Sequence, residues 1–311
     1  MDIFWQQVQQ FIRGVDTASL RQDADRPIRV ALVATGKDEL KLMANFFVPH
    51  YLRPSKAEDV KSHLVLFAVP LHPLEFHELA SCDVVISSEQ ALRQVRLDVP
   101  HVFVYHSENP KQTVREILRK KRDLALPLAK NFMPFRSFVQ QRWIQAVAAE
   151  NSLVAALQEL SKFTPLPSGA IPDHISEGQS GNSIGNSAST AAMAANQMRL
   201  AFLIAASSDS EVGFRNQRGQ ITAVAAAALG CSLLASRISN KTETASRIIS
   251  RAAFAFLGTY ATGLALQQFH KLSRSLSREE KSFAFEQAYS ITRTVLDDVL
   301  KRMASSNRSA A

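Results

Sequence analysis

Two hydrophobic periods alternate in the first third of the chain. A short apolar run at 28–34 leads into Thr35 and Gly36, and leucine, methionine and phenylalanine then recur at helical spacing as far as Phe47. Further apolar runs lie at 64–69, 83–87 and 101–105, and the last two are separated by a helical stretch at 89–95. Buried strands that alternate with helices predict a small, mostly parallel, three-layer α/β domain over residues 27–110. Ligands of such sheets bind beyond the carboxyl ends of the strands.

After Pro110 the strand signals stop, and residues 111–303 predict an all-α helical domain. Its first part, 111–162, reads as two helices interrupted near Pro127 and Pro134. The segment 165–190 is rich in proline, glycine and serine, which predicts a flexible loop. The last helix is expected to place Phe283, Ile291, Val295, Val299 and Met303 on one side, and residues 304–311 are expected to form a disordered tail.

The N-terminal segment, 1–26, carries aromatic and aliphatic residues between positions 4 and 15 at steps of three and four, with glutamines between them. This spacing predicts an amphipathic helix. Because its polar face is glutamine rather than lysine, packing on this protein or on a partner is favoured over a lipid surface. The start of the chain lacks a basic and then apolar leader pattern, so we expect a protein that is not secreted.

Two stretches, 221–236 and 252–269, carry no charge and form a candidate apolar hairpin. They rise about 24–27 Å as helices, which is less than a hydrocarbon core of ~30 Å. Basic residues lie at both ends, so the positive-inside rule gives no reason to translocate the loop. A buried hairpin of a soluble or peripheral bundle and a membrane-embedded hairpin both stay open. The apolar residues that we assign to this hairpin are Ile221, Leu229, Leu233, Phe254, Tyr260 and Leu264.

Composition excludes several classes of protein. A chain of 311 residues with 46% hydrophobic content can bury a large core, which excludes disorder. The two cysteines, Cys82 and Cys231, lie far apart without histidine at ligand spacing, which excludes a disulfide framework and a zinc ribbon and indicates a reducing compartment. The cluster between His72 and His77 has the wrong spacing for a zinc helix, so no metal is expected.

The net charge of +8 is concentrated in residues 111–142. Such a block either is a solvated helix face or binds anionic lipid head groups, at ~1 kcal/mol per basic residue near the surface. An unidentified protein partner is the other expectation, and the lack of interleaved aromatic residues disfavours nucleic acid. The candidate patch for anionic lipid or a partner consists of Lys111, Arg115, Arg119, Lys120, Lys121 and Arg122.

The sequence motifs that bind a nucleotide in GTPases are absent after the first and the last predicted strands. Gly36-Lys37 stands alone: on a phosphate-binding loop pattern, Ala31 would occupy the first glycine and Asp38 the position of the magnesium-binding hydroxyl. The last strand is followed by His106-Ser107-Glu108-Asn109 rather than by Asn-Lys-x-Asp. We therefore expect neither catalytic residues nor a cofactor. The alternative is an unusual nucleotide site that uses Lys37 and Asn109.

Three segments of the helical half stand out together. They are Leu128-Ala129-Lys130-Asn131-Phe132-Met133-Pro134-Phe135-Arg136, followed by the helix with Ala148-Ala149-Glu150-Asn151; Ala195-Asn196-Gln197-Met198-Arg199-Leu200; and Phe256-Leu257-Gly258-Thr259-Tyr260-Ala261-Thr262-Gly263. In this order they resemble the YcjF-like family, a bacterial helical domain of unknown function that accompanies GTPase domains. The resemblance implies a helical module attached to a GTPase-like domain at the bacterial inner membrane.

Together these observations lead us to expect a non-enzymatic, pseudo-GTPase-like scaffold or interaction protein. It would act at the cytoplasmic face of the bacterial inner membrane, either peripherally or through an embedded hairpin. A divergent GTP-binding switch protein is the alternative.

Overall fold

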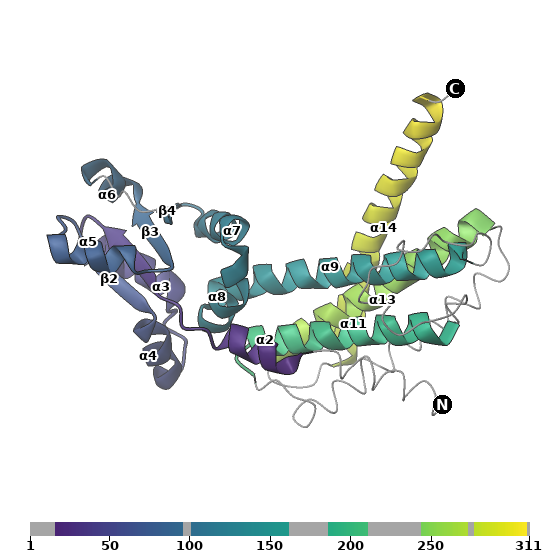
Figure 1. Cartoon of the computed structure of the whole chain (residues 1–311), viewed down its shortest axis with the longest axis horizontal. Helices are drawn as coiled ribbons and strands as arrows, with labels where there is room; N and C mark the ends of the chain where they lie inside the picture. Colours follow the sequence, from purple (N-terminus) through teal and green to yellow (C-terminus); the bar gives the residue numbers. More distant parts are fainter. Residues whose placement is uncertain (1–15, 96–100, 162–185, 211–243, 273–276, 310–311) are drawn as a thin grey trace. The chain divides into compact units, whose positions relative to one another are not determined.

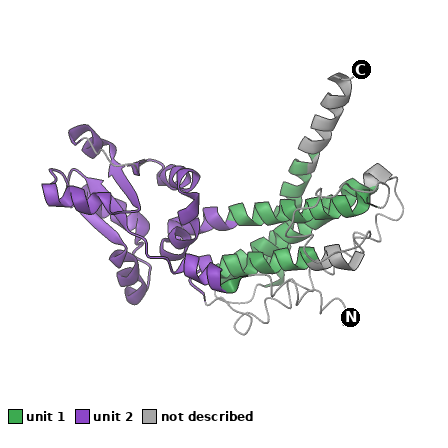
Figure 2. Ribbon diagram, in the orientation of Figure 1, with its two compact units in different colours: residues 1–17, 141–205, 211–311 green, residues 18–140, 206–210 purple. Residues whose placement is uncertain are grey.

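The computed structural model describes residues 16–95, 101–161, 186–210, 244–272 and 277–309 (Figure 1). The chain divides into two compact units, coloured separately in Figure 2. We call residues 18–140 with 206–210 the α/β unit, and residues 1–17, 141–205 and 211–311 the helical unit. The predicted amphipathic segment at 3–15 and the first apolar stretch at 221–236, with Ile221, Leu229 and Leu233, lie outside the described residues.

The α/β unit contains a four-stranded sheet in which every strand is parallel to its neighbours, in the order β2-β1-β3-β4. This confirms the expectation of a small α/β domain with a parallel sheet. The strands are β1 (Val30–Ala34), β2 (Leu64–Ala68), β3 (Val84–Ser88) and β4 (Val102–Tyr105). The helices of this part are α2 (Thr17–Ala24), α3 (Lys37–Phe47), α4 (Pro54–Ser62), α5 (Pro73–Ala80), α6 (Glu89–Gln94), α7 (Pro110–Lys120) and α8 (Ala125–Asn131), with a 3-10 turn η1 at Arg122–Leu124.

Helices cover both faces of this sheet. On one face Ala31, Val33 and Val85 pack with Leu79 of α5 and Ala91 of α6. On the other face Phe46 of α3 contacts the ring of Tyr105, and Lys120 of α7 lies over the ring of Phe103. All five residues of β1 are buried, as expected for the central strand of a parallel sheet whose two faces are covered.

The connection between β1 and β2 reverses direction in the strand order relative to the connection that leads to β3. The sheet therefore has a topological switch point between β1 and β3, and the crevice beyond the carboxyl ends of these two strands is where ligands of this architecture bind. This edge of the sheet is the first place to look for a site.

Within the described residues, the helical unit contains four long helices. Their bounds are α9 (Met133–Leu160), α11 (Asn186–Ser207), α13 (Thr244–Leu272) and α14 (Arg278–Ser309). The first eight residues of α9 and the last two of α11 belong to the α/β unit. α11 is buried nearly all round from Ala194 to Ala206, which is typical of a core helix.

The structure corrects several boundaries. The units divide between Gln140 and Gln141 rather than at residue 110, because α7 packs on β4 and the ring of Phe135 stacks on Phe47 of α3. Residues 186–190, expected in the flexible segment, form the first turn of α11. Residues 304–309, expected in the tail, continue α14.

The apolar face expected for the last helix is wrong at Phe283 and Val295. Small residues, Ala284, Ala288 and Thr292, form its buried stripe, and α14 packs closely on α13. Phe283 and Val295 are exposed instead. Close packing of two helices favours small side chains at the contact, which leaves the larger ones outside it.

Candidate functional site

A cavity of about 920 Å³ lies at the carboxyl ends of the strands in the α/β unit. Its walls come from the residues that follow three strands: Thr35–Glu39 after β1, Ser88–Gln90 after β3, and Tyr105–Asn109 at the end of β4 and beyond. The volume falls within the range of small-molecule sites. We call this cavity the strand-end pocket.

The first turn of α3 holds a carboxylate at the position where a phosphate-binding loop would offer its N–H groups. The backbone N–H of Thr35 donates to Glu39 Oε2 at 3.1 Å, and the Thr35 hydroxyl donates to the same oxygen at 2.9 Å. Glu39 thus takes up the free N–H at the end of β1. A phosphate placed there would meet a negative charge rather than a hydrogen-bond donor.

Gly36 lacks the backbone conformation and the close packing that require glycine in a phosphate-binding loop. Its backbone is extended, with φ of −157°, and a Cβ added at this position would meet nothing within 4 Å. Neither a special conformation nor close packing therefore requires glycine here.

The structure brings together the two residues of the alternative nucleotide hypothesis. Lys37 and Asn109 both line the strand-end pocket. The lining also includes four acidic residues, Asp38, Glu39, Glu89 and Glu108. Lys37 is the one lysine among the lining residues. The pocket therefore has an acidic lining that repels an anionic ligand.

A hydrogen-bond network supports the β4 side of the pocket. Gln112 donates to Glu116 at 3.0 Å, and this bond lowers the pKa of the Glu116 carboxyl, with a contribution from His106, whose Nε2 lies 3.5 Å from Glu116 Oε1. The backbone N–H of His106 donates to the hydroxyl of Thr113, and that hydroxyl donates to the carbonyl of Val104. These bonds fix the loop after β4 on α7. Burial raises the pKa of the Tyr105 hydroxyl, which stays neutral.

The groups that the sequence offered for metal binding do not form a site. Glu75 accepts the backbone N–H of His72 at 2.6 Å, as a capping residue of α5. Within the described part of the chain, no group of three or more His, Cys, Asp or Glu side chains is arranged to hold a metal ion.

The predicted basic patch lies on α7 and the turn after it, in the α/β unit. α7 buries Val114, Ile117 and Leu118 and presents Lys111, Arg115 and Arg119 at steps of four residues on its exposed side. Lys120 and Arg122 are exposed as well, and Lys121 is half-buried. The guanidinium of Arg115 lies 5.3 Å from the centre of the Phe138 ring, which holds one cation of the stripe in place.

The helical unit contains a buried polar cluster, which we call the amide cluster. Asn151 of α9 and Gln197 of α11 both donate to the hydroxyl oxygen of Thr259 on α13, at 2.9 and 3.0 Å. Asn196 donates to Asn151 Oδ1 at 3.0 Å. Asn151, Gln197 and Thr259 are each at least 97% buried. The cluster joins the three helices that carry the residues on which the YcjF-like resemblance rests.

Charged and small residues join the same helices elsewhere. Arg251 of α13 pairs with the fully buried Glu159 of α9 at 2.5 Å. A Cβ at Gly263 would lie 2.6 Å from Ile144 Cγ1, so α13 approaches α9 too closely there for any side chain. Neither the partners of Asn151 nor the pairing of Glu159 follows from hydrophobic periodicity, and sequence reasoning missed both.

The second apolar stretch of the candidate hairpin is part of α13. Tyr260 and Leu264 are buried, Phe254 is half-buried, and the Tyr260 hydroxyl accepts a hydrogen bond from Gln141. Among the described residues, one helix, Arg247–Leu272, is long and apolar enough to cross a membrane by length and composition, and 39% of its most apolar window is buried. Helices of soluble cores pass the same test.

Comparisons of this chain with protein-family models, with curated proteins and with solved structures found no match.

Proposed function

We propose that this protein is a non-enzymatic scaffold or interaction protein whose α/β unit is a GTPase-like domain without nucleotide chemistry. It acts at the cytoplasmic face of the bacterial inner membrane. The observation that supports the loss of nucleotide chemistry is the Glu39 carboxylate on the Thr35 N–H, within a pocket lined by four acidic residues. An enzyme of phosphoryl transfer needs the opposite arrangement, since its donors and cations stabilise charge on the transferred group.

Nucleotide binding is tested by thermal denaturation of the full chain with GTP and magnesium. We expect an unchanged melting temperature. Glu39→Ala, which frees the Thr35 N–H, is measured beside Glu58→Ala, an exposed glutamate of α4 outside the pocket. A rise in the melting temperature of the unmodified protein would contradict the proposal.

The second candidate, a divergent GTP-binding switch, draws support from the placement of Lys37 and Asn109 in one cavity. It requires a rise in melting temperature with GTP that Lys37→Ala and Asn109→Ala each remove. Lys41→Ala, an exposed lysine on the same helix that does not line the pocket, is the matched control.

The membrane part of the proposal rests on the α7 stripe and on the YcjF-like resemblance. Three cations at one exposed side of a helix, with two more directly after it, give a surface that anionic head groups attract at ~1 kcal/mol per residue. The rest of α7 is committed to the core of the α/β unit, so the stripe can bind lipid without unfolding.

Peripheral attachment is favoured over an embedded hairpin. α13 directs Thr259, Tyr260 and Arg251 to partners on α9 and α11. Between the positions of these partners, α9 exposes Arg142 and Gln145. Insertion of α13 into a bilayer would have to carry these polar side chains with it or break the contacts, and both are costly in hydrocarbon.

Vesicle co-sedimentation tests the surface. With vesicles that contain phosphatidylglycerol, reversal of Lys111, Arg115 and Arg119 to Glu should weaken binding roughly a hundredfold. Reversal of Lys41, Lys61 and Arg93, exposed cations elsewhere on the α/β unit, changes the net charge equally and should have a much smaller effect. Equal losses from both triple variants would show that net charge alone acts.

Fractionation of cell membranes separates the two modes of attachment. We expect high salt to release the protein, because an electrostatic surface contact is screened. Release by detergent alone, after salt and alkaline carbonate washes, would show that the apolar helices are embedded and would overturn peripheral attachment.

A further inference from the structure

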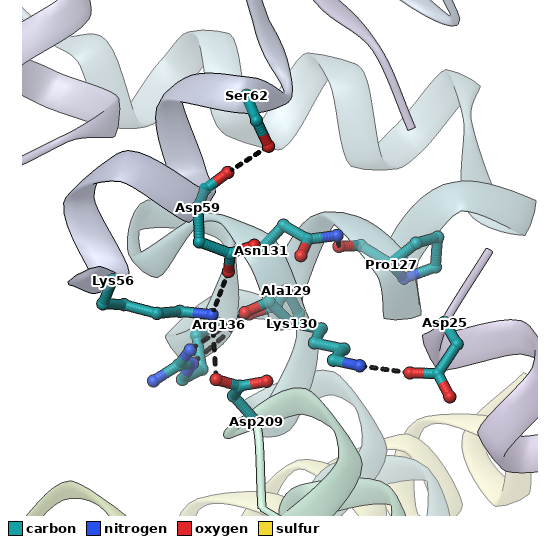
Figure 3. Close-up of polar contacts among 10 residues, drawn as sticks. All are labelled: Asp25, Lys56, Asp59, Ser62, Pro127, Ala129, Lys130, Asn131, Arg136 and Asp209. Atoms are coloured by element: carbon teal, nitrogen blue, oxygen red, sulfur yellow. Dashed lines mark hydrogen bonds and ion pairs between the residues drawn. The ribbon is translucent and has the colours of Figure 1, made fainter. Parts of the chain in front are cut away.

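The C-terminal end of α11 and the turn after it, residues 206–210, belong to the α/β unit although nearly all the rest of this helix belongs to the helical unit. Two sets of contacts hold the segment. Lys56 of α4 bridges two carboxylates, with its Nζ 2.7 Å from Asp59 Oδ2 and 2.8 Å from Asp209 Oδ2 (Figure 3). Gln140 Nε2 donates to the hydroxyls of Ser207 and Ser208 at 2.8 and 2.9 Å.

The contacts of the turn are polar. They border a cavity of about 410 Å³ whose lining includes Asp25, Lys56, Asp59, Lys130 and Asp209. Lys130 pairs with Asp25 in the same cavity, and Arg136 donates to the backbone carbonyls of Ala129 and Lys130. The contacts that Asp209 makes at this cavity are therefore between charged groups.

The turn itself is built to present Asp209. Its φ of 58° is in the left-handed region, and its N–H donates to the carbonyl of Ala206, which ends the helix. Aspartate and asparagine tolerate this conformation better than other non-glycine residues. The carboxylate that meets Lys56 is therefore supplied by the residue that terminates α11.

We propose that Lys56, Asp209 and Gln140 form a detachable clasp that holds the end of α11 on the α/β unit. The Lys56 and Asp209 side chains are 27% and 39% exposed, so water and ions reach the pair. The sheet core lies outside these contacts and keeps its apolar packing when they break. The clasp is thus a conformational device that opens locally, and it is independent of the proposed function.

Hydrogen exchange of the full chain, read by mass spectrometry, tests the clasp. Asp209→Asn keeps the left-handed turn and removes the charge, and Lys56→Met removes the cation. We expect each to speed exchange of the 206–210 amides roughly three- to tenfold, and Lys56→Met with Gln140→Ala to speed it further. Exchange in β1 and β3 should stay at its original rate.

Lys61→Met is the matched control, because Lys61 is an exposed lysine on the same helix that does not line this cavity. It should leave residues 206–210 protected. Unchanged exchange in Asp209→Asn and Lys56→Met would overturn the clasp. A parallel rise in the β1 and β3 peptides would also overturn it, since Lys56 would then support the whole unit rather than one segment.

Discussion

The two units differ in the polar groups that they bury beside their apolar cores. In the α/β unit the central strand is apolar throughout, and the charged groups gather at the strand-end pocket, at α7 and around Lys56. In the helical unit the amide cluster and the Glu159–Arg251 pair are buried among the helices. An apolar centre tolerates small shifts between its elements, whereas a buried polar centre is stable at one register, in which each group meets its partner.

The buried ion pair gives the largest expected effect. Arg251→Met leaves Glu159 charged and fully buried, which should lower the free energy of unfolding of the helical unit by about 3–5 kcal/mol. Urea unfolding followed by fluorescence of Trp143, on the helical-unit part of α9, measures it. In the α/β unit, Arg93→Met breaks the exposed pair with Glu89 and should cost at most about 1 kcal/mol.

A double variant sharpens this first test. Glu159→Met with Arg251→Met removes both charges and should recover most of the loss, because apolar residues of similar size fill the same space. If the double variant is as unstable as Arg251→Met alone, the cost comes from lost packing rather than from the loss of this ion pair.

The amide cluster is the next point at which the units should differ. Asn151→Ala deprives Asn196 of its acceptor and Thr259 of one donor, which should cost about 1–3 kcal/mol. Ser87 of β3 is equally buried, but its hydroxyl donates to the neighbouring Ser88 carbonyl, so Ser87→Ala should cost less than about 1 kcal/mol. Equal losses in urea unfolding would contradict the idea that the helical unit depends on polar register.

Two glycines make a third contrast. Gly263→Ala forces a Cβ against Ile144, which is fully buried, and should cost about 1–3 kcal/mol. Gly36→Ala meets open space in an extended backbone and should change stability by less than about 1 kcal/mol. Combining Gly263→Ala with Ile144→Ala should cost less than the sum of the two, as measured by a double-mutant cycle, because the clashing atoms are then absent.

The difference between the units also explains what the sequence could predict. The strands were found because apolar runs bounded by polar residues report burial directly, and the pocket followed from the rule for parallel sheets. The roles of Glu39, Lys56 and Glu159 were not predicted. Each is an ordinary charged residue in the sequence, and Asp209 and Arg251, which pair with Lys56 and Glu159, lie on other elements far along the chain.

The prediction of the buried face of α14 was wrong for a related reason. Phe283 and Val295 satisfy the hydrophobic period, but α14 meets α13 through alanine and threonine, which the period does not rank as contact residues. Asn151, Gln197 and Thr259 belong to the segments that resemble the YcjF-like family, but only the three-dimensional structure shows that Asn151 and Gln197 both donate to the Thr259 hydroxyl.

The smallest expected effect concerns acid. The hydrogen bond from Lys56 holds the pKa of the Asp59 carboxyl below its ordinary value of 3.8, with further lowering by His63 and Lys130. Burial opposes the charge on Lys56, but its bonds to Asp209 and Asp59 outweigh this and raise its pKa above 10.5.

The Asp59 carboxylate therefore contributes stability above its ordinary pKa, and this contribution is lost as the pH falls through the lowered value. Hydrogen exchange of α4, residues 54–62, corrected for the intrinsic rate, should stay constant from pH 7 to about 4 and rise below it. Asp59→Asn should remove part of that rise, whereas Glu58→Gln, at the exposed neighbouring position, should keep all of it. Exchange around the amide cluster of the helical unit should not change over this pH range. If it rises at the same pH, acid destabilises the whole chain, and the response does not come from the charged groups of the α/β unit.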